Sequence, residues 1–91
     1  MNRLTITLYS SSFCGACSAT RHTLSRAAEL LGDRIVLREV NVADDAARAE
    51  EAQISSTPTV VMHSPEGAEV MRATGAPTLN QVLTAVAGTL G

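Results

Sequence analysis

Two cysteines three positions apart are the residues of this chain whose type and spacing point most directly to chemistry. They lie in Cys14-Gly15-Ala16-Cys17, and the sequence has no other cysteine. In one turn of helix their Cα atoms would lie about 5–6 Å apart, inside the range that a disulfide bond spans. A pair so close in sequence cannot join distant parts of a fold, and in a reducing compartment such pairs serve redox catalysis or metal binding.

The expected surroundings of the pair predict different roles for its two thiols. Cys14 falls where a strand gives way to a helix, and the unpaired N–H groups of a helix N-terminus lower the pKa of a thiol placed there. Cys14 is therefore the predicted nucleophile. Cys17 begins the apolar stripe of the helix, so we expect its sulfur to be shielded and to resolve a mixed disulfide. Gly15 and Ala16 are small enough to let a substrate chain approach closely.

A metal site is the alternative that the residues themselves leave open. A structural zinc ion takes four ligands, and the other candidate ligands are His22, which is not on the helical face of Cys14, and His63 in a later strand. This spacing argues against a site within one chain. Binding of a cluster between two chains, each contributing a cysteine, stays open.

Apolar periodicity and turn residues predict an α/β fold with the order βαβαββα. The strand over residues 35–42 has aliphatic side chains on both faces, so we expect it to be central and parallel to the first strand. Pro65-Glu66-Gly67 predicts a hairpin turn, and Thr78 with Gln81 forms a possible capping box. We also expect strands at 4–9, 59–63 and 68–73. Three helices should end at Gly32, near Gln53 and near the C-terminus. The second of them should place Ala46, Ala49 and Ala52 against the sheet. Together they predict one domain over residues 1–91, a four-stranded mixed sheet flanked by helices.

Composition excludes several classes of function. The chain has 91 residues, 45% of them hydrophobic and 18% charged, with a net charge of −2, which is typical of a small globular protein. Its 7 Lys and Arg residues form no basic run, and Tyr9 and Phe13 are its aromatic side chains, so we expect no nucleic-acid partner. The N-terminus lacks a signal-peptide pattern and no segment is long and apolar enough for a membrane span, so we expect a cytoplasmic protein. We also expect it to be a monomer.

Beyond the cysteines, most of the chain resembles thioredoxin. The resemblance lies in the strand end Asn41-Val42, the acidic helix after it, Ser56-Thr57-Pro58-Thr59, Pro65-Glu66-Gly67 and Thr74-Gly75-Ala76. It implies a thioredoxin-like fold and a protein disulfide reductase whose redox group is the Cys14–Cys17 disulfide, with no other cofactor. It also implies a separate reductase as electron donor, an NADPH-dependent flavoprotein, and disulfide-containing proteins as substrates.

The resemblance also implies a substrate-binding edge. The proline that matches Pro58 is cis in the family, and the backbone of the residue before it, here Thr57, pairs with the substrate chain as an added strand. Gly75 would permit close approach of backbone near the cysteines. Phe13 and Tyr9 flank the pair, either as an apolar platform for substrates or as a strand tyrosine and a helix-entry staple.

Three residues differ from the thioredoxin pattern. Phe13 stands in place of a tryptophan, Ala16 in place of a proline, and Leu8 in place of a buried acid on the preceding strand, which leaves proton transfer at Cys17 without an assigned group. The short N-terminal part also resembles glutaredoxin, so reduction by a low-molecular-weight thiol is the alternative. However, Gly75-Ala76-Pro77-Thr78 matches the glutathione-binding pattern of that family poorly.

Overall fold

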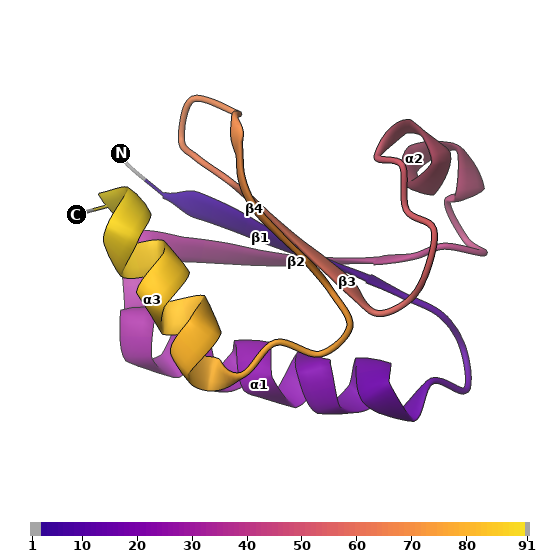
Figure 1. The fold of residues 1–91 in the computed structure, drawn as a ribbon, viewed down its shortest axis with the longest axis horizontal. Coiled ribbons are helices and arrows are strands. Elements are labelled where there is room, and N and C mark those ends of the chain that lie inside the picture. Colours follow the sequence, from indigo (N-terminus) through magenta and orange to yellow (C-terminus); the bar gives the residue numbers. More distant parts are fainter. Residues whose placement is uncertain (1–2, 91) are drawn as a thin grey trace.

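A computed structural model describes residues 3–90, which form one mixed sheet with helices on both of its faces (Figure 1). The order βαβαββα and the four-stranded mixed sheet predicted from the sequence are confirmed. In chain order the elements are β1 (Leu4–Ser10), α1 (Gly15–Leu31), a 3₁₀ turn (Gly32–Arg34), β2 (Ile35–Asn41), α2 (Ala46–Glu51), β3 (Thr59–His63), β4 (Glu69–Thr74) and α3 (Leu79–Leu90).

The strands lie in the order β2-β1-β3-β4. β1 pairs with β2 in parallel, with Leu8 opposite Glu39, and pairs with β3 antiparallel on its other edge. β3 and β4 form the predicted antiparallel hairpin. α1 connects the parallel pair and packs with α3 below the sheet in Figure 1, while α2 lies above it.

The expectation that the second strand is central is wrong, because β2 forms an edge of the sheet. Ile35 and Val40 are its buried residues, and Leu37 is 37% exposed. The aliphatic content of this segment describes the strand but not its place in the sheet. The place of β2 depends on which strand the β3–β4 hairpin pairs with. The hairpin pairs with the free edge of β1, so β1 and β3 are the central strands and β2 remains at the edge of the sheet.

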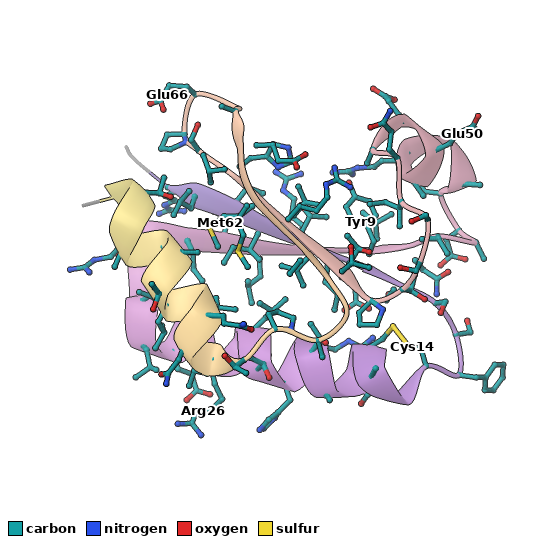
Figure 2. The ribbon with its side chains drawn as sticks, viewed as in Figure 1. Tyr9, Cys14, Arg26, Glu50, Met62 and Glu66 are labelled. Atoms are coloured by element: carbon teal, nitrogen blue, oxygen red, sulfur yellow. A yellow bond between two sulfur atoms is a disulfide. The ribbon has the colours of Figure 1, made fainter. Side chains whose placement is uncertain are left out.

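The hydrophobic core on one face of the sheet is larger than the core on the other face. The larger core lies between the sheet and the helices α1 and α3, and the smaller one lies on the α2 face around Tyr9, Val40 and Val61. Figure 2 shows Met62 on the first face and Tyr9 on the second. The larger core consists of Leu4, Ile6, Leu8, Leu24, Ala27, Ile35, Val60, Met62, Val82 and Val86.

Local sequence signals set the helix ends. Thr78 and Gln81 form the predicted capping box at α3, where each side chain bonds the backbone N–H of the other at 3.1 and 2.9 Å. α2 is capped by the Asp45 carboxylate, and it buries Ala49; the expected burial of Ala46 is wrong, because Ala46 faces solvent. Within residues 3–90 no helix has both the length and the apolar character needed to cross a membrane.

Candidate active site

Cys14 and Cys17 form a disulfide at the point where β1 leads into α1 (Figure 2). Their Cα atoms are 5.2 Å apart. Cys14 is the N-cap residue of α1, with extended backbone, and its Sγ accepts a hydrogen bond from the backbone N–H of Cys17 at 3.1 Å. The sulfur of Cys14 thus takes the place of a capping oxygen at the positive end of the helix dipole, a position that stabilises a thiolate.

The two cysteines differ in their access to solvent. Cys17 is 1% exposed and lies on the buried side of α1 with Leu24 and Ala27, whereas Cys14 is half-buried. Gly15 and Ala16 between them are exposed.

Thr20, which interrupts the apolar stripe in the sequence, is fully buried at the second turn of α1. Its hydroxyl donates a hydrogen bond to the carbonyl of Ala16 at 2.8 Å. Because the helix backbone satisfies this hydroxyl, the burial of Thr20 does not leave an unpaired polar group next to Cys17. The polar residue therefore fits the core side of the helix without a cost in unpaired polar atoms.

Thr57 and Pro58 lie beside the loop that carries the cysteines. The hydroxyl of Thr57 is 2.7 Å from that of Ser11, three residues before Cys14, and the two share a hydrogen bond. The Thr57–Pro58 peptide bond is cis. Pro58 is buried and its carbonyl accepts a hydrogen bond from the Gly75 N–H at 2.9 Å, so the turn after β4 holds this segment from the other side.

The backbone conformation at position 75 favours glycine. Its φ is +95°, in the left-handed region that other residues avoid. The Gly75 backbone approaches that of Pro58 through the 2.9 Å hydrogen bond, but a Cβ built at position 75 would meet no atom of the described part of the chain within 4 Å. The turn conformation after β4, rather than crowding, requires glycine here.

The aromatic pair does not form a common platform. Phe13 is fully exposed, with φ of +58°. Its ring therefore does not pack against the helix, as the side chain of a hydrophobic staple would. Tyr9 is 4% exposed and packs in the smaller core on the α2 face, across the sheet from α1. The alternation of β1 places Tyr9 on that face, so only Phe13 remains at the cysteine loop.

Glu39 is the charged residue near the site that the sequence reasoning missed. Leu8 is 2% exposed, and the buried polar residues among 3–90 carry hydroxyls rather than carboxylates. Glu39, opposite Leu8 on β2, accepts hydrogen bonds from Arg21 at 2.7 and 2.6 Å and from the Ser10 hydroxyl at 2.8 Å. The hydrogen bonds from Arg21 are the main cause that holds the pKa of Glu39 below its usual value. The register of β1 on β2 creates this cluster, and sequence spacing does not reveal it.

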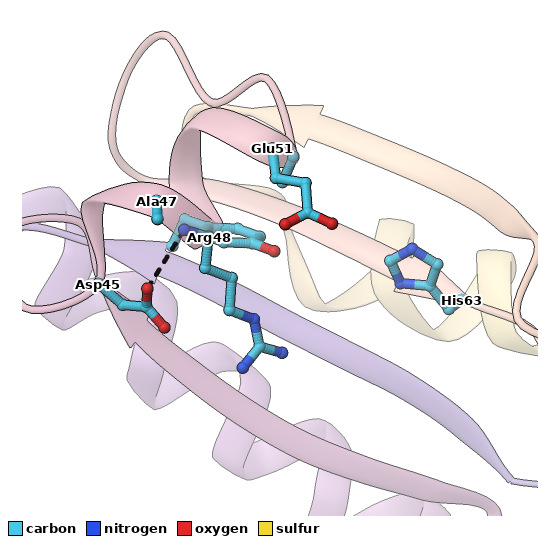
Figure 3. A pocket seen from close by; sticks show the side chains of 7 residues that line it. Asp45, Ala47, Arg48, Glu51 and His63 are labelled. Carbon is cyan, nitrogen blue, oxygen red and sulfur yellow. Dashed lines mark hydrogen bonds between the residues drawn. The ribbon is translucent and has the colours of Figure 1, made fainter.

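The two histidines lie apart from the cysteines. His22 is exposed on α1, and His63, on β3, lines a cavity of about 480 Å³ on the α2 face together with Arg48 and Glu51 (Figure 3). In the part of the chain that the structure describes, no three His, Cys, Asp or Glu side chains are grouped so that they could hold a metal ion.

Known proteins resemble this chain in sequence pattern and in fold. The family model for thioredoxin matches residues 1–87. No curated protein sequence matches the chain. Thioredoxin-2 of the malaria parasite, described as a component of its protein secretion machinery, superimposes with a TM-score of 0.90 at 17% identity, over 96% of this chain and 84% of that one.

Two further solved structures show the same architecture. Chloroplastic thioredoxin z superimposes with a TM-score of 0.89 at 19% identity, over 97% of this chain and 79% of that one. Thioredoxin of Malassezia sympodialis gives 0.82 at 19% identity, over 98% and 76%. At these identities the structures establish the shared fold, and the family model adds the sequence pattern. The chain therefore belongs to the thioredoxin family.

Proposed function

We propose that this protein reduces protein disulfides through Cys14 and Cys17. Membership of the thioredoxin family and the disulfide between the two cysteines support thiol-disulfide exchange. The observation that carries the proposal is the pairing of a half-buried sulfur at the helix N-cap with a buried sulfur one turn further on. An incoming disulfide then reaches Cys14 first, and Cys17 is shielded from it by burial.

In the reduced protein the Cys14 thiolate attacks one sulfur of the substrate disulfide. The substrate S–S bond breaks, one substrate thiolate leaves, and Cys14 becomes part of a mixed disulfide. Cys17, after losing its proton, attacks the Cys14 sulfur and releases the second substrate thiolate. Two electrons pass to the substrate, and the protein ends with the Cys14–Cys17 disulfide that the structure contains.

The substrate chain docks on the edge formed by Thr57 and Pro58. Its backbone adds to the end of β3 beside Thr57, a mode of recognition in which main-chain hydrogen bonds provide most of the affinity. The exposed Gly15 and Ala16 leave room above the cysteines, and the exposed ring of Phe13 offers an apolar contact. Gly75 holds Pro58 in place through its N–H.

The oxidised protein needs an electron donor. We take residues 1–91 to act as one domain and a monomer in the cytoplasm, with no cofactor besides the disulfide. The sequence contains no glycine-rich dinucleotide fingerprint, so reducing equivalents come from a separate NADPH-dependent flavoprotein thioredoxin reductase.

Trapping of the mixed disulfide tests the proposed roles. The reduced Cys17→Ser variant should accumulate a covalent adduct with a disulfide-bonded protein substrate, since its resolving thiol is gone, and mass spectrometry should place the adduct on Cys14. The Cys14→Ser variant, in which the remaining thiol is buried, serves as the matched control and should form little adduct. Equal adduct formation by both variants would overturn the assignment.

The electron donor is tested with the wild-type protein. Thioredoxin reductase with NADPH should reduce it rapidly, and glutathione with its own reductase should do so slowly. The reverse order would favour the glutaredoxin-type alternative. A protein that purifies with zinc or an iron–sulfur cluster at fixed stoichiometry, and forms no intramolecular disulfide, would overturn the redox proposal itself.

A further inference from the structure

Arg21, Glu39 and Ser10 form a hydrogen-bonded network at the cysteine end of α1 that the proposed reaction leaves without a role. The guanidinium of Arg21 donates two hydrogen bonds to the Glu39 carboxylate, from Nε to Oε1 at 2.7 Å and from Nη2 to Oε2 at 2.6 Å. Oε2 also accepts a hydrogen bond from Ser10 Oγ at 2.8 Å. One carboxylate thus joins α1, β2 and the last residue of β1.

The helix places Arg21, the α1 member of this network, about one turn from Cys17. Arg21 follows Cys17 by four residues in α1, and side chains with that spacing are neighbours on a helix surface, with Cβ atoms about 5–6 Å apart. Ser10 is 1% exposed and leads into the loop that carries Cys14. The two bonds from Arg21 and the anchor from buried Ser10 fix the position of the Glu39 carboxylate.

We propose that Arg21 and Glu39 are positioning residues that together set how readily Cys17 gives up its proton. A cation near a thiol favours the thiolate, and an anion disfavours it. Arg21 alone would therefore promote ionisation of Cys17, and Glu39 offsets that effect by binding the guanidinium. The functional meaning of this inference rests on the proposed role of Cys17 as the resolving thiol.

Few other charges face Cys17 from the elements packed on α1. α3 contains no titratable side chain, nor do residues 52–62, which include Thr57 and Pro58. Tyr9 of β1 lies on the opposite face of the sheet, and the 3₁₀ turn with Asp33 and Arg34 lies at the far end of α1. The remaining charged or titratable side chains of α1 and β2 are His22, Arg26, Glu29 and Arg38.

Both members of the pair are partly open to solvent, which limits the size of the effect. The Arg21 and Glu39 side chains are 50% and 37% exposed. Water and salt weaken a charge at this exposure, so removing either charge should shift the pKa of Cys17 by about half a unit at low ionic strength, and by less in high salt.

The test is a pH titration of Cys17 in the Cys14→Ser background, where it is the sole thiol and serine can replace the capping atom. Thiolate absorbance in the ultraviolet reports ionisation. Glu39→Gln should lower the pKa of Cys17, Arg21→Gln should raise it, and the double variant should return it close to the parent value. A purely structural role would not produce shifts of opposite sign.

The pair Arg72–Glu69 provides matched controls. It has the same two-bond geometry, at 2.9 and 2.8 Å, but lies on β4 at the other edge of the sheet. Glu69→Gln and Arg72→Gln should leave the pKa of Cys17 unchanged. Shifts of the same sign for Glu39→Gln and Arg21→Gln, or shifts no larger than those of the controls, would overturn the inference. Since the titration uses no substrate and no reductase, its outcome is independent of whether the proposed disulfide reduction fails.

Discussion

The two faces of the sheet differ in how firmly they are covered. On one face α1 and α3 bury the larger core, and the cysteines are built on the helix that closes it. On the other face α2 has 6 residues, its core is centred on Tyr9, Val40 and Val61, and a pocket of about 480 Å³, open to solvent, lies beside it. The redox pair therefore stands on the face with the larger core, where Cys17 is buried beside Leu24 and Ala27 of α1.

The largest expected difference between the faces is in activity. Cys14→Ser should reduce disulfide-reductase activity to background, because the proposed nucleophile is lost, whereas Tyr9→Phe on the α2 face should retain activity close to wild type. The measurement is the initial rate of reduction of a disulfide-bonded protein by the reduced variants. Comparable loss in Tyr9→Phe would show that the α2 face takes part in the reaction.

Adjacent residues of β3 offer a matched comparison of stability. Val60 and Val61 are 0% and 1% exposed and point to the larger and the smaller core respectively. Val60→Ala should cost about 2–3 kcal/mol, because its cavity is enclosed by packed side chains, and Val61→Ala about 1 kcal/mol, because α2 can settle onto the space. Denaturant unfolding measures both. Equal losses would mean that the two faces are packed to the same density.

Helix caps should show the same contrast at a smaller scale. Thr78→Ala removes the capping box of α3 and should cost about 1 kcal/mol, as N-cap truncations typically do. Asp45→Ala removes the cap of the short α2 through a bond of 3.2 Å, and should cost about half as much. Thermal unfolding of the two variants compares them. A larger loss for Asp45→Ala would indicate that α2 contributes more to the fold than its packing suggests.

The smallest effect concerns pH. The pKa of Glu39 is lowered, mainly by its hydrogen bonds from Arg21, so its contribution to stability is present above the unfolded value of 4.5 and is lost as pH falls through the folded value. At 37% exposure this amounts to a few tenths of a kcal/mol. Unfolding free energies of wild type and Glu39→Gln should therefore differ near neutral pH and converge in acid. A difference that does not change with pH would assign the loss to packing rather than to charge.

Local signals in the sequence predicted the parts of the site that depend on neighbouring residues. The cysteines, the helix that begins at them, the hairpin turn and the Thr78–Gln81 capping box each follow from residue types a few positions apart. Because each of these features depends on residues that are close in sequence, residue types and spacing are enough to predict it.

Features that depend on pairing between distant segments were missed or wrong. The edge position of β2 is decided by where β3 adds, and the cluster of Arg21, Glu39 and Ser10 exists only through the register of β1 on β2. Tyr9 and Phe13 were predicted to flank the cysteines, either as an apolar platform or as a strand tyrosine and a helix-entry staple, but Tyr9 packs in the core of the α2 face and Phe13, with its positive φ, is fully exposed. Periodicity within one segment does not determine such relations.

The reduction potential of the Cys14–Cys17 couple tests the central claim most directly. The protein is equilibrated with dithiol buffers of defined potential, and the free thiols are counted. We expect a reversible two-electron transition below about −230 mV, as a protein disulfide reductase requires. A much higher potential would indicate an oxidant or isomerase instead, and failure to form the intramolecular disulfide in solution would contradict the redox function altogether.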